Sequence, residues 1–195
     1  MHTLIVVSHP DPESLTHAVA HAFAEGVEEL GQHTAEIADI AAEGFQAAYN
    51  QADRIGYHQP AALPADVLRE QERIDKADAI TLVYPIYWWS FPGQLKGWID
   101  RVFTNGWAYG EKADGSLEKL LTRLNVHLIG IGGADTGTYA RHHYDTAMRT
   151  QIDHGIFDFC GARVLTSQFL LDVNNQAALS HLATARDLGR NAFRL

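Results

Sequence analysis

The stretch that most constrains the fold is a largely apolar run at residues 79–83, which leads directly into Tyr84 and Pro85. The run lacks the alternation of a half-exposed strand and is typical of a central parallel strand covered on both faces. Pro85 has no amide hydrogen to donate to a sheet, so we expect the strand to end there. An aromatic loop follows, made of Tyr87, Trp88, Trp89 and Phe91. From these residues alone, a core plug and a wall for a flat ligand are equally good interpretations.

Segments typical of strands and helices alternate along the whole chain. Strands are predicted at residues 3–8, 34–40, 79–83, 126–131 and 162–167. Helices are predicted at residues 15–30, 65–77, 93–104, 117–124, 138–159 (interrupted around Gly155) and 176–193. This alternation predicts an α/β fold, a flavodoxin-like doubly wound five-stranded parallel sheet with helices on both faces. With 195 residues, we expect residues 1–195 to form a single domain.

Residues 41–65 form the one long segment without hydrophobic periodicity. A structureless excursion of this length inside a domain is usually functional or contacts a partner. Residues 105–116, rich in glycine and aromatic side chains, are predicted to form a second loop.

Charge and composition exclude several classes of protein. The formal net charge of −9 argues against a nucleic-acid partner, which favours a basic face. The single cysteine, Cys160, excludes an internal disulfide framework and favours a cytoplasmic location. The N-terminus lacks the basic region of a signal peptide, and no segment has the roughly 18 apolar residues of a membrane span. No His-Glu-x-x-His or Cys-x-x-Cys motif is present, so no metal site is expected.

Three loops follow predicted strands and therefore meet at one edge of the sheet. The first, from His9 to Thr16, opens a helix whose free amides and dipole attract anions. Ser14 and Thr16 can add hydroxyl donors there, and Ser14 is also suited to cap the helix. The loop carries neither the P-loop nor the dinucleotide glycine motif.

The second and third loops favour a planar ligand. The aromatic loop after Pro85 offers a wall, and Gly132 and Gly133 allow a backbone to approach a ring closely. Tyr139 and His142 lie just beyond, where a phenol and an imidazole can donate hydrogen bonds or protons to a developing anion. For the histidines, a solvated helix surface is the alternative interpretation.

Several segments together resemble the NAD(P)H:quinone oxidoreductase family of flavodoxin-like flavoproteins over nearly the whole chain. This family includes ancillary subunits of potassium-efflux systems and relatives of modulator of drug activity B. The segments are LIVVSHP at 4–10, ADAITLVYPIYWW at 77–89, PGQLKGWIDRVF at 92–103, WAYG at 107–110, GG at 132–133 and FCG at 159–161.

The resemblance implies a cytoplasmic homodimer with active sites at the subunit interface. It implies a bound flavin, FAD in preference to FMN, that takes hydride from NAD(P)H and passes it to a quinone in a ping-pong cycle. A regulatory subunit docked on a membrane potassium-efflux transporter and a one-electron carrier are the alternatives.

The resemblance also assigns residues. It places the cofactor along His9, Ser14, Leu15, Thr16, Pro85, Ile86, Tyr87, Trp88, Trp89, Gly132 and Gly133. It makes Tyr139 catalytic as well as cofactor-binding, with His142 or His143 as the catalytic histidine, although neither lies at the family's spacing. Trp88 and Trp89 face the substrate, and Tyr109 and Phe159 are contributed by the second subunit.

Overall fold

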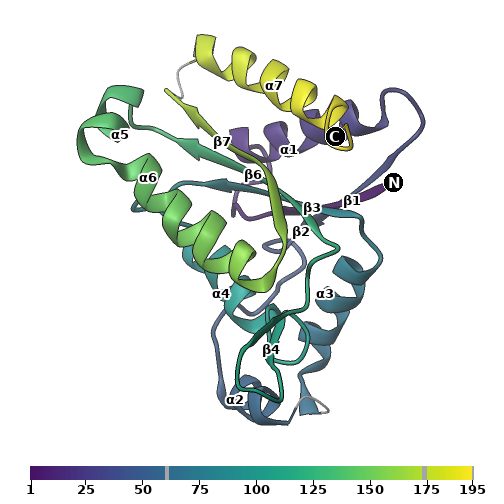
Figure 1. The fold of residues 1–195 in the computed structure, drawn as a ribbon. Helices are drawn as coiled ribbons and strands as arrows, with labels where there is room; N and C mark the ends of the chain where they lie inside the picture. The colour runs from purple at the N-terminus through teal and green to yellow at the C-terminus, as the bar shows by residue number, and fades with distance from the viewer. Residues whose placement is uncertain (60–61, 173–174, 195) are drawn as a thin grey trace.

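A five-stranded parallel sheet forms the centre of the protein (Figure 1). The computed structural model describes residues 1–59, 62–172 and 175–194. The strands lie in the order β2-β1-β3-β6-β7, with bounds His2–Val7 (β1), Thr34–Asp39 (β2), Ala79–Pro85 (β3), Asn125–Gly132 (β6) and Arg163–Leu171 (β7). This order confirms the predicted doubly wound sheet, and β3 ends at Pro85 as expected.

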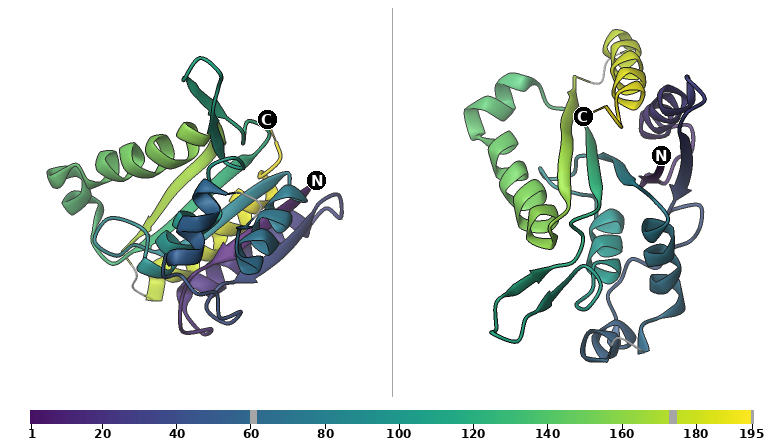
Figure 2. Two further views of the ribbon diagram at one scale, coloured as in Figure 1. Left: turned by 90° about the horizontal axis from the view of Figure 1, so that it is seen from below. Right: turned by 45° about the vertical axis from the view of Figure 1, so that its right-hand side comes forward.

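Helices cover both faces of the sheet (Figures 1 and 2). Alternate residues of β1 divide the core: Ile5 and Val7 pack toward one face, and Leu4 and Val6 toward the other. The first face is covered by α1 (Leu15–Glu28) and α7 (Asn175–Arg190). The second is covered by α3 (Ala65–Asp75), α4 (Gly93–Val102) and the helical stretch formed by α6 (Tyr144–Met148) and η2 (Arg149–Asp158). Among the described residues, no helix is long and apolar enough to cross a membrane.

The segment from 41 to 65 is more ordered than its sequence indicates. It contains α2 (Gln51–His58), which begins with a capping box between Asn50 and Asp53. Only Asp53 and Gly56 of this helix are buried, so it carries no apolar stripe that periodicity could detect. Residues 60 and 61 lie outside the described residues.

The short helix predicted at residues 117–124 is wrong. Leu117–Lys119 forms β5, which pairs antiparallel with β4 (Tyr109–Glu111) in a hairpin. The leucines at 117, 120, 121 and 124 have helical spacing, but only Leu121 and Leu124 are buried. The backbone after β5 forms hydrogen bonds with a distant part of the chain and not within a helix: the Leu121 amide donates to the Cys160 carbonyl at 3.0 Å.

The predicted helix break at Gly155 is also wrong. The helix that begins as α5 (Thr136–His142) is interrupted at His143, which has a left-handed backbone with φ of 55°. Gly155 lies inside η2, a continuous π-helix. A left-handed histidine gives no signal in the sequence, whereas a glycine suggests a break whether or not one occurs.

Candidate cofactor and active site

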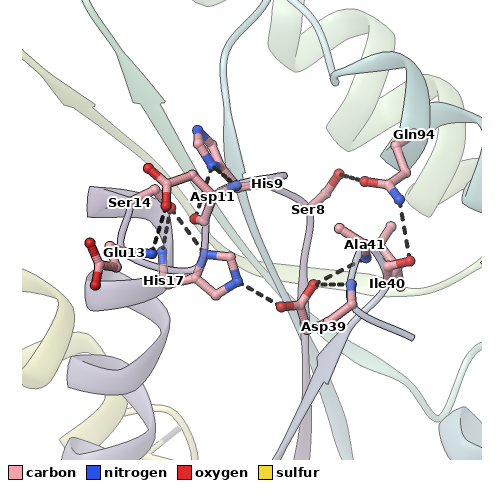
Figure 3. A network of polar contacts seen from close by, with 11 residues as sticks. Ser8, His9, Asp11, Glu13, Ser14, His17, Asp39, Ile40, Ala41 and Gln94 are labelled. Atoms are coloured by element: carbon pink, nitrogen blue, oxygen red, sulfur yellow. Dashed lines mark hydrogen bonds and ion pairs between the residues drawn. The ribbon is translucent and has the colours of Figure 1, made fainter. Parts of the chain in front are cut away.

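The first loop gathers its predicted residues at the start of α1 (Figure 3). Ser14 caps the helix, and its Oγ accepts from the His17 amide at 3.3 Å. Leu15 is half-buried and Thr16 is buried behind it. His9 is half-buried too, and its Nδ1 accepts from the Asp11 amide at 3.0 Å. The free amides of the first turn therefore lie beside hydroxyl and imidazole groups, which is the composition of an anion site.

A histidine that the sequence analysis did not single out lies behind this loop. His17 is buried, with Nδ1 3.0 Å from Ser14 Oγ and Nε2 2.8 Å from Asp39 Oδ2. Figure 3 shows that the contact joins α1 to the end of β2. A histidine three residues after a cap is an ordinary pattern, and nothing in the sequence connects it to a carboxylate 22 residues later.

The aromatic loop is a tight turn held by reciprocal backbone bonds. The Tyr87 amide donates to the Ser90 carbonyl at 3.2 Å, and the Ser90 amide returns a bond at 3.1 Å. The central residues Trp88 and Trp89 have φ of 51° and 54°, a conformation unusual for bulky side chains. Such turns normally use glycine or asparagine. The left-handed backbone at the two tryptophans therefore has a conformational free-energy cost, which the surrounding structure must offset. Trp88 is 87% exposed, whereas Phe91 at the end of the loop is 5% exposed and belongs to the core. The loop therefore packs its far end into the core and leaves the tip of the turn free for a ligand.

Ring stacking connects this turn to the helix beyond β6. The Trp89 ring stacks on Tyr144 with a centroid distance of 3.8 Å, and Ser90 Oγ donates to Gln151 Oε1 at 2.6 Å. Tyr144 in turn lies 6.1 Å from Tyr139 and 5.2 Å from His142, centroid to centroid. The sequence analysis missed Tyr144, which brings the second and third loops together.

Tyr139 lies against the end of β6. A Cβ added at Gly132 would sit 2.9 Å from the Tyr139 hydroxyl, so only glycine allows the phenol this close to the strand. The same Cβ would be 3.4 Å from Ile86 Cδ1, which places the aromatic loop beside this point. Tyr139 is 4% exposed, and burial raises the pKa of its phenol. The phenol therefore stays protonated near neutral pH and is available as a hydrogen-bond donor.

The other predicted site residues lie on the surface or away from the three loops. Gly133, His142 and His143 are exposed. Tyr109 and Phe159 contact each other with ring centroids 5.3 Å apart and line a cavity of about 560 Å³ together with Tyr57. Their ring contact joins the β4–β5 hairpin to the end of η2, and this pair is not brought to the three loops within the described part of one chain.

Comparisons with known proteins identify the family and the fold. Residues 1–190 match the Flavodoxin_2 family, whose description is a flavodoxin-like fold. The chain belongs to this family. Ribosyldihydronicotinamide dehydrogenase [quinone] of Mus musculus is 29% identical, and the match covers 89% of this chain and 83% of the relative. The resemblance to quinone oxidoreductases is thereby confirmed.

Two solved structures show the same architecture. NAD(P)H:quinone oxidoreductase from Methanothermobacter marburgensis has a TM-score of 0.89 and 28% identity, with 98% of each chain covered. General stress protein 14 of Treponema denticola, solved in complex with FMN, has a TM-score of 0.66 and 23% identity over 96% of this chain and 95% of its own.

The residues of this Flavodoxin_2 protein fit a flavin. A planar ring requires an apolar wall and a nearby hydrogen-bond donor; Trp88 is exposed at the tip of the aromatic turn, and the Tyr139 hydroxyl lies beside Gly132 at the end of β6. A phosphate requires free amides and hydroxyls, which the start of α1 carries. Within the described ranges, no group of three or more His, Cys, Asp or Glu side chains is placed to hold a metal ion.

Proposed function

We propose that this protein is a flavin-dependent NAD(P)H:quinone oxidoreductase with a two-electron, ping-pong cycle. The observation that carries the proposal is the convergence of Tyr139, the aromatic turn and the start of α1 at the carboxyl edge of the sheet. When bound, a flavin accepts hydride from a nicotinamide coenzyme and delivers it to an acceptor such as a quinone. Family membership and the quinone reductase names of the relatives support the same reaction.

The protein's own residues would hold the cofactor and stabilise charge. Residues Pro85–Trp89 and Gly132–Gly133 would line the ring, and the start of α1 would bind the phosphate. The Tyr139 phenol would donate a hydrogen bond to negative charge on a reduced flavin, and His142 is the second candidate for this task. Trp88, which is exposed in this chain, faces the entering substrate.

FAD is the proposed cofactor, with FMN as the alternative. A cavity of about 240 Å³ adjoins the phosphate loop and is lined by His9, Pro10, Pro12, Asp39, Ala41 and Ala42. This cavity, beside the start of α1, would receive a further part of a dinucleotide, which supports FAD. FMN is the flavin named for two structural neighbours, general stress protein 14 of Treponema denticola and an azoreductase of Bacillus anthracis.

The site is proposed to be completed by a second copy of the chain. Tyr57, Leu117, Leu120 and Phe159 expose between 36% and 43% of their surface around Tyr109. We call these five residues the aromatic surface. Apolar side chains gathered in this way favour a protein interface, and a homodimer would bring Tyr109 and Phe159 toward the partner's flavin. A cytoplasmic location is proposed from the single cysteine.

Acid release of the bound flavin followed by chromatography tests the class and the cofactor together. We expect a yellow protein that releases FAD, is bleached by NADH or NADPH without oxygen, and is reoxidised by a quinone. Steady-state plots at several quinone concentrations should give the parallel lines of a ping-pong reaction. A protein that retains no flavin after reconstitution would exclude the proposal, and release of FMN would replace FAD.

A further inference from the structure

The side chains of Ser14, His17 and Asp39 form a connected chain from the start of α1 to the end of β2 (Figure 3). The His17 side chain is 7% exposed and that of Asp39 is 22% exposed. Both ring nitrogens of His17 have a partner. Which of them carry protons therefore decides whether the Ser14 hydroxyl donates to His17 or accepts from it.

The Asp39 end of the chain is fixed as a carboxylate. Its Oδ1 accepts from the amides of Ala41 and Ala42 at 3.1 and 3.0 Å. Burial raises the pKa of Asp39, but the Ala42 amide and His17 outweigh it, so the pKa lies below its usual value. A carboxylate only accepts hydrogen bonds, so the proton between Asp39 and His17 belongs to His17 Nε2.

The Ser14 end has two arrangements. When the imidazole is neutral, its Nδ1 is an acceptor, and the Ser14 hydroxyl donates its only hydrogen bond to this nitrogen. With an imidazolium, Nδ1 donates to Ser14 Oγ, which also accepts from the His17 amide. Both lone pairs of the oxygen are then used, and the hydroxyl proton is free to point at an anion.

We propose that His17 is a positioning residue that takes up a proton when a cofactor phosphate binds, and that its imidazolium frees the Ser14 hydroxyl to donate to that phosphate. The inference rests on the proposed function, because it takes the phosphate of a flavin nucleotide as the ligand. It adds that binding of the phosphate is coupled to uptake of one proton from solvent, and that Asp39 balances the charge on His17.

Two neighbouring features support this assignment. The cavity of about 240 Å³ beside the loop is lined by both Asp39 and His9, so a ligand seated there lies next to the chain of contacts. An anion at Ser14 would favour a cation on His17, since opposite charges at short range stabilise one another. Among the described residues, two titratable groups lie beside His17. They are Asp39 at the end of β2 and His9 in the first loop, whose ring centroid is 6.3 Å from that of His17. Asp11 and Glu13 lie in the same loop and are exposed.

Serine, histidine and aspartate in this order also occur in hydrolases, where a neutral imidazole withdraws the serine proton. Here Ser14 Oγ is the helix cap and accepts a backbone amide at 3.3 Å. An oxygen that already accepts hydrogen bonds is a weaker nucleophile, so the arrangement favours donation to an anion.

Calorimetric titration of the flavin-free full chain tests the proposal. FAD is added in two buffers of different ionisation enthalpy, at intervals from about pH 5.5 to about pH 9, where histidine titrates. The FAD diphosphate keeps its charge over this range, so any proton taken up binds to the protein. We expect uptake that reaches between about one half and one proton per FAD, with affinity falling most steeply at the pH of maximum uptake, by about threefold to tenfold per pH unit. Riboflavin, which has no phosphate, should bind without uptake.

Variants locate the proton. His17→Gln should abolish the uptake, whereas His21→Gln, an exposed position one turn further along α1, should retain it. His9→Gln tests the neighbouring imidazole. If FMN binds in place of FAD, the difference in proton uptake between wild type and His17→Gln is the measure, since the phosphate monoester itself titrates at about pH 6.

Each outcome decides the matter. FAD binding without proton uptake in the wild type overturns this inference and leaves the proposed function intact. Uptake that persists in His17→Gln, or that disappears only in His9→Gln, also overturns it. If His17→Gln does not fold, His9→Gln decides: uptake of a proton with FAD but not with riboflavin that persists in His9→Gln supports His17, and its loss in His9→Gln overturns the inference. Absence of any flavin binding overturns both proposals.

Discussion

The guanidinium of Arg101 lies against the carboxylate of Asp53 with both side chains out of water. Its Nε is 2.9 Å from Oδ1 and 3.0 Å from Oδ2, and both residues are less than 5% exposed. Nη1 also donates to Asp66 and to the Gln46 carbonyl, each at 2.6 Å. One arginine on α4 therefore anchors both ends of the excursion between β2 and α3.

Removal of Arg101 should destabilise the fold strongly, because it leaves the buried Asp53 carboxylate without a cation. We expect Arg101→Met to lower the free energy of unfolding by about 3–5 kcal/mol, measured by denaturant titration, whereas Asp53→Asn should cost less because Arg101 keeps its bonds to Asp66. Lys96→Met is the matched control, since Lys96 and Asp100 form an exposed pair on the same helix. Its cost should stay below about 0.5 kcal/mol. Equal effects at the two sites would show that the buried pair does not hold the excursion.

Close packing of the excursion on α4 gives a second prediction. A Cβ at Gly97 would overlap the carbonyl oxygen of Ala47, whereas one at Gly93 meets nothing within 4 Å. Gly97→Ala should therefore cost at least about 2 kcal/mol of stability by forcing the backbones apart. Gly93→Ala, in the same helix, should be neutral or slightly stabilising. Comparable thermal midpoints for the two variants would contradict the close contact.

These contacts explain the segment at 92–103 that carries much of the resemblance. Gly97 and Arg101 hold the excursion, and Trp98 Nε1 donates to Glu70 Oε2 at 2.9 Å. The most specific stretch of the sequence therefore builds the scaffold under the site. The family could be identified from it, but contacts with a flavin could not.

The sheet order and the convergence of the three loops follow from local patterns, so the sequence was sufficient to predict them. The partners that complete the site were not predictable. His17 meets Asp39, and Tyr144 meets Trp89, only because separate elements pack together. The β4–β5 hairpin was missed for the same reason, because its leucine spacing imitates a helix while its backbone pairs elsewhere.

Burial of a histidine in the sheet should make stability depend on pH. Burial lowers the pKa of His127 to about 4, from an ordinary value of 6.5. In the unfolded chain His127 is therefore protonated below about pH 6.5, whereas in the folded protein it is protonated only below about pH 4. We expect up to about 3 kcal/mol of stability to be lost across that window as the pH falls. His127→Gln should lack this component, whereas His21→Gln, on the exposed side of α1, should keep it in denaturant titrations over the same range.

The aromatic surface leads to a prediction about assembly. Phe159 is 42% exposed beside Tyr109, so a charge there would be buried in the proposed dimer. Phe159→Asp should raise the dissociation constant of the dimer at least about tenfold, measured by sedimentation velocity. Leu179→Asp is the control, because Leu179 is 72% exposed on α7. A dimer that persists in Phe159→Asp but dissociates in Leu179→Asp would place the interface elsewhere.

Loss of the Tyr139 hydroxyl should slow reduction of the flavin without releasing it. The phenol is kept protonated by burial and lies where β6 ends at Gly132, so it can donate to charge that appears as hydride arrives. Tyr139→Phe preserves the ring contacts with Tyr144 and Phe169 and removes only that donor. We expect the rate of reduction by NAD(P)H, measured by stopped-flow absorbance, to fall about tenfold to a hundredfold. Tyr84→Phe, which changes another buried phenol, should alter the rate less than about twofold, and unchanged kinetics in Tyr139→Phe would remove Tyr139 from the catalytic residues.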